Sequence, residues 1–214
     1  MALATFGFAV AAHAQPASVY NWTGQYIGGH VGYGIGSYHH RNDNNGARTR
    51  DFDMDGIVGG LSAGYNWQTR GSALVLGIEA DIAASGVKGA DDDPAWGCGG
   101  LPCTASVKWF GTVRPRAGIA INNALFFATG GWAFGNVEAT IGSMAGTVEG
   151  SSKIQSGWTA GAGIEWAFSP RWSAKVEYLH VDLGGFVYII NGATPISVRG
   201  LEFDVVRLGV NYRW

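Results

Sequence analysis

The carboxy-terminal stretch Gly200–Trp214 alternates between apolar and polar residues up to its last position. One face is apolar and ends in the aromatic residues Tyr212 and Trp214, whereas the other face includes Arg207 and Arg213. A period of two is that of a β-strand with one apolar and one polar side. The stretch exceeds the roughly 9–11 residues that a tilted strand needs to cross a bilayer. It therefore either spans a membrane or closes a soluble β-sandwich or barrel.

Seven further runs with the same alternation precede this stretch. They are Tyr26–Ser37, Ile57–Gln68, Ala73–Ser85, Val107–Ile121, Ala124–Ile141, Ser156–Phe168 and Trp172–Leu183. The connections between runs alternate between short ones (69–72, 122–123, 169–171) and long ones rich in small and polar residues (38–56, 86–106, 142–155, 184–199). This pattern predicts an all-β fold. The expected architecture is an eight-stranded antiparallel up-and-down transmembrane β-barrel with short periplasmic turns and long extracellular loops.

The composition agrees with such a barrel. Charged residues make up 14% of the chain, against about 25% in an average soluble domain. There is no apolar run of about 18 residues, which excludes a spanning helix. Mean hydropathy is +0.07, as expected when apolar and polar residues alternate. The net charge of -2 gives no indication of a nucleic-acid partner.

Charged residues in mid-strand indicate which face points inward. They are Glu79, Asp81, Arg114, Arg116, Glu165, Lys175, Glu177, Arg207 and Arg213. The opposite, apolar faces are too bulky to fill the narrow interior of an eight-stranded barrel. Aromatic residues also gather near both ends of the runs, as in the interfacial girdles of membrane barrels. We therefore predict a mixed-charge network in the lumen, and the many glycines of the runs would give it room.

The short turns set the register of neighbouring strands. Asn122-Asn123 is typical of a type I′ hairpin, which pairs Ile121 with Ala124. The turn Ser169-Pro170-Arg171 pairs Phe168 with Trp172, so that Glu165 and Lys175 should face each other. Glu79 with Arg114 and Glu177 with Arg207 are expected to pair between adjacent strands.

The amino-terminal residues 1–14 have the apolar character of a signal peptide that lacks its basic start. Ala12-His13-Ala14 fits the small-x-small cleavage pattern, which predicts cleavage after Ala14. Residues 15–25 would then be a periplasmic segment, and residues 26–214 the barrel domain.

Cys98 and Cys103 fall in the long connection 86–106, where an exported protein is expected to form a disulfide. The neighbouring run Asp91–Asp93 offers a weaker, calcium-like alternative. His39 and His40, beside Arg41, are expected in a loop, with a metal or glycan contact as the less favoured interpretation. We assign no metal and no cofactor.

Catalytic residues are hard to find in this chain. A hydrolase needs a nucleophile, a base and an orienting acid in contact. His180-Val181-Asp182 is the nearest arrangement, and it has no serine partner in the sequence. We therefore predict a protein that is not an enzyme. A narrow channel for small solutes and an outer-membrane lipid-modifying enzyme are the alternatives.

Several segments together resemble one family, the small outer-membrane β-barrel proteins of α-proteobacteria, often labelled porin family. The segments are Tyr20–Gly29, Gly64–Gln68, Gly77–Ile82, Gly111–Arg114, Thr129–Ala133, Gly157–Gly163 and Lys175–Leu179. One departure is Pro115, where the family more often has Gly, and a local break of the ladder is expected there.

The resemblance implies an OmpA/OmpX-like barrel, integral to the outer membrane and monomeric, with roles in envelope integrity and host or surface contact. Implied partners are outer-membrane lipid, lipopolysaccharide and an extracellular ligand at the loops, but no nucleic acid. The last residues Val210, Tyr212 and Trp214 would be the signal read by the barrel-assembly machinery, with Trp in the place of the usual Phe.

Overall fold

The computed structural model describes residues 20–44, 46, 51–91, 103–142, 148–190 and 194–214. These residues form ten strands: β1 Gly24–Asn42, β2 Phe52–Gln68, β3 Leu74–Ser85, β4 Lys88–Asp91, β5 Cys103–Ile121, β6 Ala124–Gly142, β7 Val148–Ala167, β8 Trp172–Asp182, β9 Phe186–Ile190 and β10 Thr194–Arg213. In the described part of the chain, no helix is long and apolar enough to cross a membrane.

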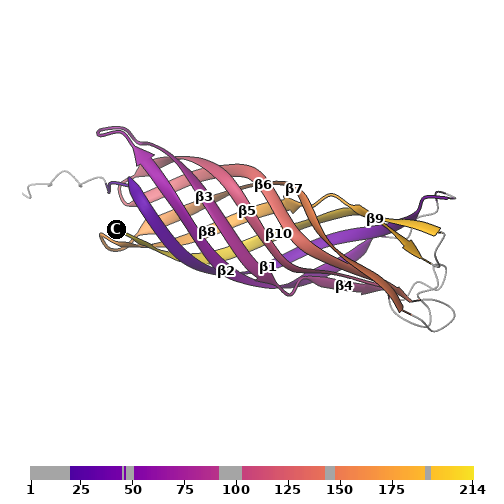
Figure 1. The fold of residues 1–214 in the computed structure, drawn as a ribbon. Coiled ribbons are helices and arrows are strands. Elements are labelled where there is room, and N and C mark those ends of the chain that lie inside the picture. The colour runs from indigo at the N-terminus through magenta and orange to yellow at the C-terminus, as the bar shows by residue number, and fades with distance from the viewer. Residues whose placement is uncertain (1–19, 45, 47–50, 92–102, 143–147, 191–193) are drawn as a thin grey trace, which may run out of the picture.

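The sheet closes on itself because β1 pairs with both β2 and β10, and every pairing is antiparallel. The strands β4 and β9 are short continuations of β3 and β8 beyond an irregular step, so the wall has eight strands. The predicted eight-stranded antiparallel barrel is confirmed. Figure 1 shows the carboxy terminus and the start of β1 at one end, which we call the turn-side end. The opposite end is the loop-side end.

The strands are longer at the loop-side end than the sequence analysis predicted. β1 continues to Asn42 and β2 begins at Phe52, within the predicted loop 38–56. β7 begins at Val148 and β10 at Thr194, again within predicted loops. The prediction failed because the apolar and polar faces exchange sides there, which hides the continuation of each strand.

β2 and β10 both show this exchange. Toward the turn-side end of β2, Leu61 is 69% exposed and its neighbour Ser62 is buried. Toward the loop-side end of the same strand, Asp55 is exposed and Met54 is buried. In β10, Val206 and Asp204 point outward while Arg207 and Phe203 are buried in the interior. The change from apolar to charged outer residues marks the loop-side edge of the lipid-facing band.

The interior therefore has three layers. A small apolar cluster fills the turn-side end and includes Trp22, Leu125 and Phe127. Charged side chains fill the middle. A larger apolar cluster fills the loop-side half, with Tyr38 and Phe203 among its members. The predicted mixed-charge network thus occupies the middle of the lumen, whereas the loop-side half is filled by apolar side chains that the sequence analysis did not foresee.

The predicted registers are confirmed. Ile121 pairs with Ala124, and the Phe168 amide donates to the Trp172 carbonyl at 3.2 Å. The type I′ turn is wrong, since among the described non-glycine residues only Asn122 has a positive φ, 55°. A type I′ turn needs a positive φ at both central positions.

The break expected at Pro115 is present. The β5–β6 ladder skips Arg114 and Pro115 between the pairs Val113–Trp132 and Arg116–Thr129. Proline has no backbone N–H to donate.

Candidate functional site

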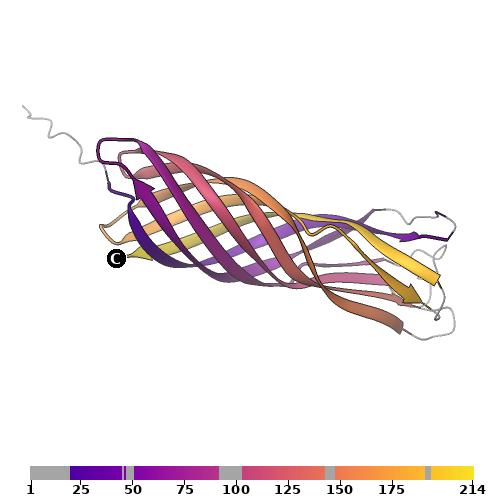
Figure 2. The same cartoon turned by 45° about the horizontal axis from the view of Figure 1, so that its top comes forward.

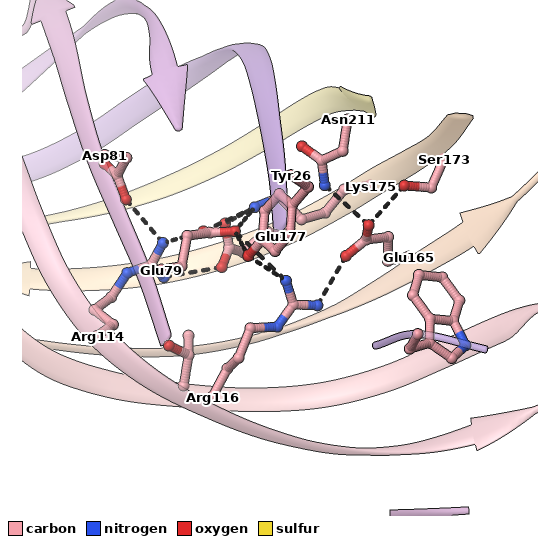
Figure 3. Close-up of polar contacts among 12 residues, drawn as sticks. Tyr26, Glu79, Asp81, Arg114, Arg116, Glu165, Ser173, Lys175, Glu177 and Asn211 are labelled. Atoms are coloured by element: carbon pink, nitrogen blue, oxygen red, sulfur yellow. Dashed lines mark hydrogen bonds and ion pairs between the residues drawn. The ribbon is translucent and has the colours of Figure 1, made fainter. Parts of the chain in front are cut away.

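The middle of the lumen is organised around Arg114, whose side chain is fully buried. One of its terminal nitrogens, Nη2, lies 2.7 Å from Glu79 Oε1 and 2.9 Å from Asp81 Oδ2. The other, Nη1, lies 2.9 Å from Glu177 Oε1. Figure 3 shows these carboxylates converging on the guanidinium from β3 and β8. A single arginine on β5 thus joins opposite walls of the barrel.

Two further cations complete this group. Lys175 Nζ lies 2.8 Å from Glu79 Oε2, and Arg207 Nε lies 2.7 Å from Glu177 Oε2. Arg207 also contacts Asp81 at 3.2 Å. With Arg114, three cations face the three carboxylates of Glu79, Asp81 and Glu177, so their charges balance. Balance matters here, because an unpaired buried charge is costly whereas a paired and hydrogen-bonded one is tolerated.

A second group lies around Glu165, also buried. Arg116 Nη2 donates to its Oε2 at 2.8 Å, and Ser173 and Asn211 donate to its Oε1 at 2.6 and 2.9 Å. Arg213 Nη2 is 3.5 Å from the same oxygen. Tyr26 joins the two groups, since its hydroxyl donates to Glu79 and accepts from Arg116 Nη1.

All nine charged residues named in the sequence analysis are buried in the lumen. The contacts expected for Glu79–Arg114 and Glu177–Arg207 are present. The expectation that Glu165 faces Lys175 is correct for the backbone register. It is wrong as an ion pair, since Lys175 contacts Glu79 and Glu177 instead.

The amino-terminal segment before β1 covers the turn-side mouth, which sequence reasoning did not foresee. Trp22 is fully buried there, and its amide donates to Gln68 Oε1 at 2.8 Å. Arg213 donates to the Trp22 carbonyl at 2.9 Å and lies 4.8 Å from the centre of its ring. The segment predicted as periplasmic is shorter than expected, because β1 begins at Gly24. The sequence did contain one indication of this cover, which is a large apolar residue, Trp22, in the short segment just before the first strand.

His39 and His40 were expected in a loop, and the structure corrects this. Both belong to β1, and His40 is 0% exposed within the loop-side apolar cluster, with its ring 5.4 Å from that of Tyr38. Burial lowers the pKa of His40 to about 4, with a smaller contribution from the charge of His39. A surface metal or glycan contact at His40 is therefore wrong.

Polar and aromatic side chains contact one another on the outside of β7, β8 and β10, where the lipid-facing band ends. Asp204 accepts from the Tyr178 hydroxyl at 2.7 Å and lies 2.8 Å from His180 Nδ1. Trp158 Nε1 donates to Asp182 at 3.1 Å. His180 thus contacts Asp204 rather than Asp182, and the arrangement considered for catalysis is not formed. Pairs of this kind are typical of a membrane interface.

Several predicted positions fall outside the described residues: Ala14, Cys98, Asp92 and Asp93. Cys103 is the first residue of β5, and Asp91 is the last of β4. Within the described ranges, no group of three metal-binding side chains occurs.

At the carboxy-terminal end of the chain, Tyr212 packs against Trp172 with ring centres 5.0 Å apart. Val210 and Trp214 are exposed on the outer face.

Comparison with known proteins gives consistent results. The family described as outer membrane protein beta-barrel domain matches residues 2–213. The 31 kDa outer-membrane immunogenic protein of Brucella melitensis is 38% identical over 94% of this chain and 87% of its own. The 22 kDa outer membrane protein of Rhizobium leguminosarum is 28% identical over 91% and 79%. Among solved structures, the outer membrane protein OprG of Pseudomonas aeruginosa superposes with a TM-score of 0.54 at 11% identity, covering 92% of this chain and 99% of OprG.

Proposed function

The chain belongs to the outer membrane protein beta-barrel domain family, and from this premise we propose that it is a closed structural barrel. In this proposal the barrel contributes to envelope integrity and presents its loop-side end for contact with host or other surfaces. It carries out no catalysis and conducts no stable ion current. Its carboxy-terminal Val210, Tyr212 and Trp214 serve as the signal for the barrel-assembly machinery.

The observation that carries the proposal is the filling of the lumen. Trp22 and its apolar neighbours occupy the turn-side mouth, the paired charges occupy the middle, and aromatic and aliphatic side chains occupy the loop-side half. A conducting porin needs a water-filled channel, and barrels with such channels have about 16–18 strands. A lumen filled by packed and paired side chains favours a mechanical role.

A role in surface contact is supported by the loop-side end. β1, β2, β7 and β10 extend beyond the lipid-facing band, so that a folded, polar-faced structure stands outside the membrane. The Brucella relative is named an outer-membrane immunogenic protein. We propose that the same region of this chain is accessible at the cell surface and acts as a surface antigen.

Planar-bilayer recording of the refolded protein tests the closed barrel. We expect no reproducible stepwise conductance, in either wild type or the exposed-loop control Asn44→Ala. Conductance steps of nanosiemens size in wild type would instead favour the narrow channel. The envelope role is tested separately, by the detergent sensitivity of a deletion strain with and without the wild-type gene. Equal sensitivity of the deletion strain and its parent would contradict that role.

A further inference from the structure

Among the residues that the structure describes, the loop-side half of β7 has a strand partner on only one of its edges. Residues 148–157 of β7 pair with β6. On the other edge, pairing with β8 ends at Trp158 and Asp182. β9, which continues β8, pairs with β10 and has no ladder to β7 among the described residues. The wall therefore has a seam between β9 and the loop-side half of β7, at the loop-side end in Figures 1 and 2.

The register shows which backbone groups of β7 face this seam. The Ala167 amide donates to Asn123 on the β6 side, and the Phe168 amide donates to Trp172 on the β8 side. Backbone groups alternate in direction along an antiparallel strand. Odd-numbered residues of β7 thus bond to β6, and even-numbered residues point the other way. Above Trp158, the N–H and C=O groups of Ser152 and Ile154 point into the seam.

The side chains around the seam have a distinct chemistry. Ile154 is 69% exposed on the outer face, four residues beyond Trp158 at the end of the lipid-facing band. Lys153 Nζ donates to the Val187 carbonyl of β9 at 2.8 Å, so a side chain bridges the strands where a backbone hydrogen bond would otherwise join them. A lysine at an open edge is one way in which proteins discourage unwanted pairing. Within the described ranges, the seam thus combines backbone groups that belong to no ladder, the exposed apolar side chain of Ile154 and the cation of Lys153.

We propose that this seam binds an extended segment of an extracellular polypeptide, which adds a strand to β7 at residues 152–156. Main-chain hydrogen bonds supply affinity in such strand addition, and side chains at alternate positions supply selectivity. An apolar side chain opposite Ile154 would cover its exposed surface. A neighbouring acidic side chain would attract the Lys153 ammonium away from the Val187 carbonyl. The partner is therefore an extended segment that alternates apolar and acidic residues. This inference rests on the proposed role in surface contact and names the chemistry of that contact.

Amide hydrogen exchange on the refolded protein in nanodiscs tests the inference, with a ten-residue peptide of alternating valine and glutamate as the probe. The amides of Ser152 and Ile154 should exchange rapidly without peptide and at least about tenfold more slowly with it. The amides of Lys153 and Gln155 are bonded to β6 and should not change. This odd–even difference is specific to strand addition, since loose adsorption of a peptide would not follow it.

A proline at Ile154 provides a sharp variant. Ile154→Pro removes a seam-facing N–H without breaking a β6 hydrogen bond, which is the condition under which an edge strand tolerates proline. The Ile154→Pro variant should fold and lose the peptide-induced protection of the Ser152 amide. Ile154→Thr retains the backbone N–H and should keep most of that protection.

Three outcomes would overturn the inference: protection of Ser152 and Ile154 before peptide is added, undiminished protection in Ile154→Pro, or exchange that slows with protein concentration. The last would indicate a second copy of the chain at the seam. None of these outcomes bears on the closed barrel or on envelope integrity, which the bilayer recordings and the detergent test decide separately.

Discussion

Glu165 and Lys175 are direct cross-strand neighbours in the β7–β8 ladder, and yet their side chains do not form an ion pair. Lys175 crosses to Glu79 on β3, and Glu165 to Arg116 on β5. The interior of an eight-stranded barrel is only wide enough for side chains to fill it. A long side chain therefore reaches the opposite wall as readily as the adjacent strand.

Double-mutant cycles should separate these two kinds of neighbour. The cycle of Lys175→Met with Glu79→Gln should show a coupling of about 1–3 kcal/mol, since the two groups are buried and in contact. The cycle of Lys175→Met with Glu165→Gln should show a smaller coupling, because these two side chains interact only through their charges and not by direct contact. Urea unfolding in lipid vesicles measures both. Equal couplings would mean that backbone register, rather than contact across the lumen, determines the interaction.

Trp22→Ala should destabilise the barrel by about 3–5 kcal/mol, the usual cost of truncating a fully buried tryptophan. The same unfolding measurement applies, and Asn21→Ala is the matched control in the same segment. Asn21 is exposed and accepts one hydrogen bond from the Thr23 amide. Asn21→Ala should therefore lower the unfolding free energy by no more than about 1 kcal/mol. Similar losses for both variants would show that Trp22 is not a structural anchor of the turn-side mouth.

His40 should make the barrel less stable in acid. It lies beyond the lipid-facing residues of β1, which end at Ile35. Its pKa is lowered from 6.5 in the unfolded chain to about 4 in the folded protein. Above pH 6.5 both states are neutral and there is no effect. Below pH 6.5 the unfolded state gains a proton first, so stability falls until about pH 4.

The measurement is the unfolding free energy of wild type and His40→Leu at pH 7.5 and pH 5. Wild type should lose about 2 kcal/mol more than the variant between these values. Carboxylates and other histidines titrate in both proteins and cancel in the difference. Parallel pH profiles would contradict the burial of His40.

Cys98 and Cys103 should be oxidised to each other in purified protein. Thiol titration without reductant should find no reactive thiol, and reduction should release two. The loop that the disulfide closes is short. Reduction should therefore lower the unfolding free energy by at most the roughly 3 kcal/mol expected for a 15-residue loop. Two titratable thiols in the unreduced protein would rule the disulfide out.

Protein isolated from outer membranes should begin at Gln15, because Ala12-His13-Ala14 fits the cleavage pattern. Amino-terminal sequencing decides this directly. A chain that retains residues 1–14 would refute the predicted site.

Much of the fold was predictable from the sequence, because side chains alternate between the two faces of a strand. Once the face of one residue is known, the faces of its neighbours follow. Once Ile121 pairs with Ala124 across a two-residue turn, every residue of β6 opposite β5 and every residue of β5 from Trp109 onward is assigned to a face, up to the register shift between Val107 and Trp109. The inward direction of Arg114 followed in this way. The loop-side extension of β2 was missed, because Asp53 and Asp55 on its outer face look like loop residues when taken alone.

By itself, the sequence determined the number of wall strands, their registers across the short turns and the charges that face inward, since all three depend on local spacing along the chain. Only the tertiary structure decided which charges meet, that Trp22 enters the turn-side mouth, and that β9 pairs with β10 rather than β7. These relationships depend on closure of the sheet, which brings residues far apart in sequence across a narrow lumen, and no local pattern specifies distances across that space.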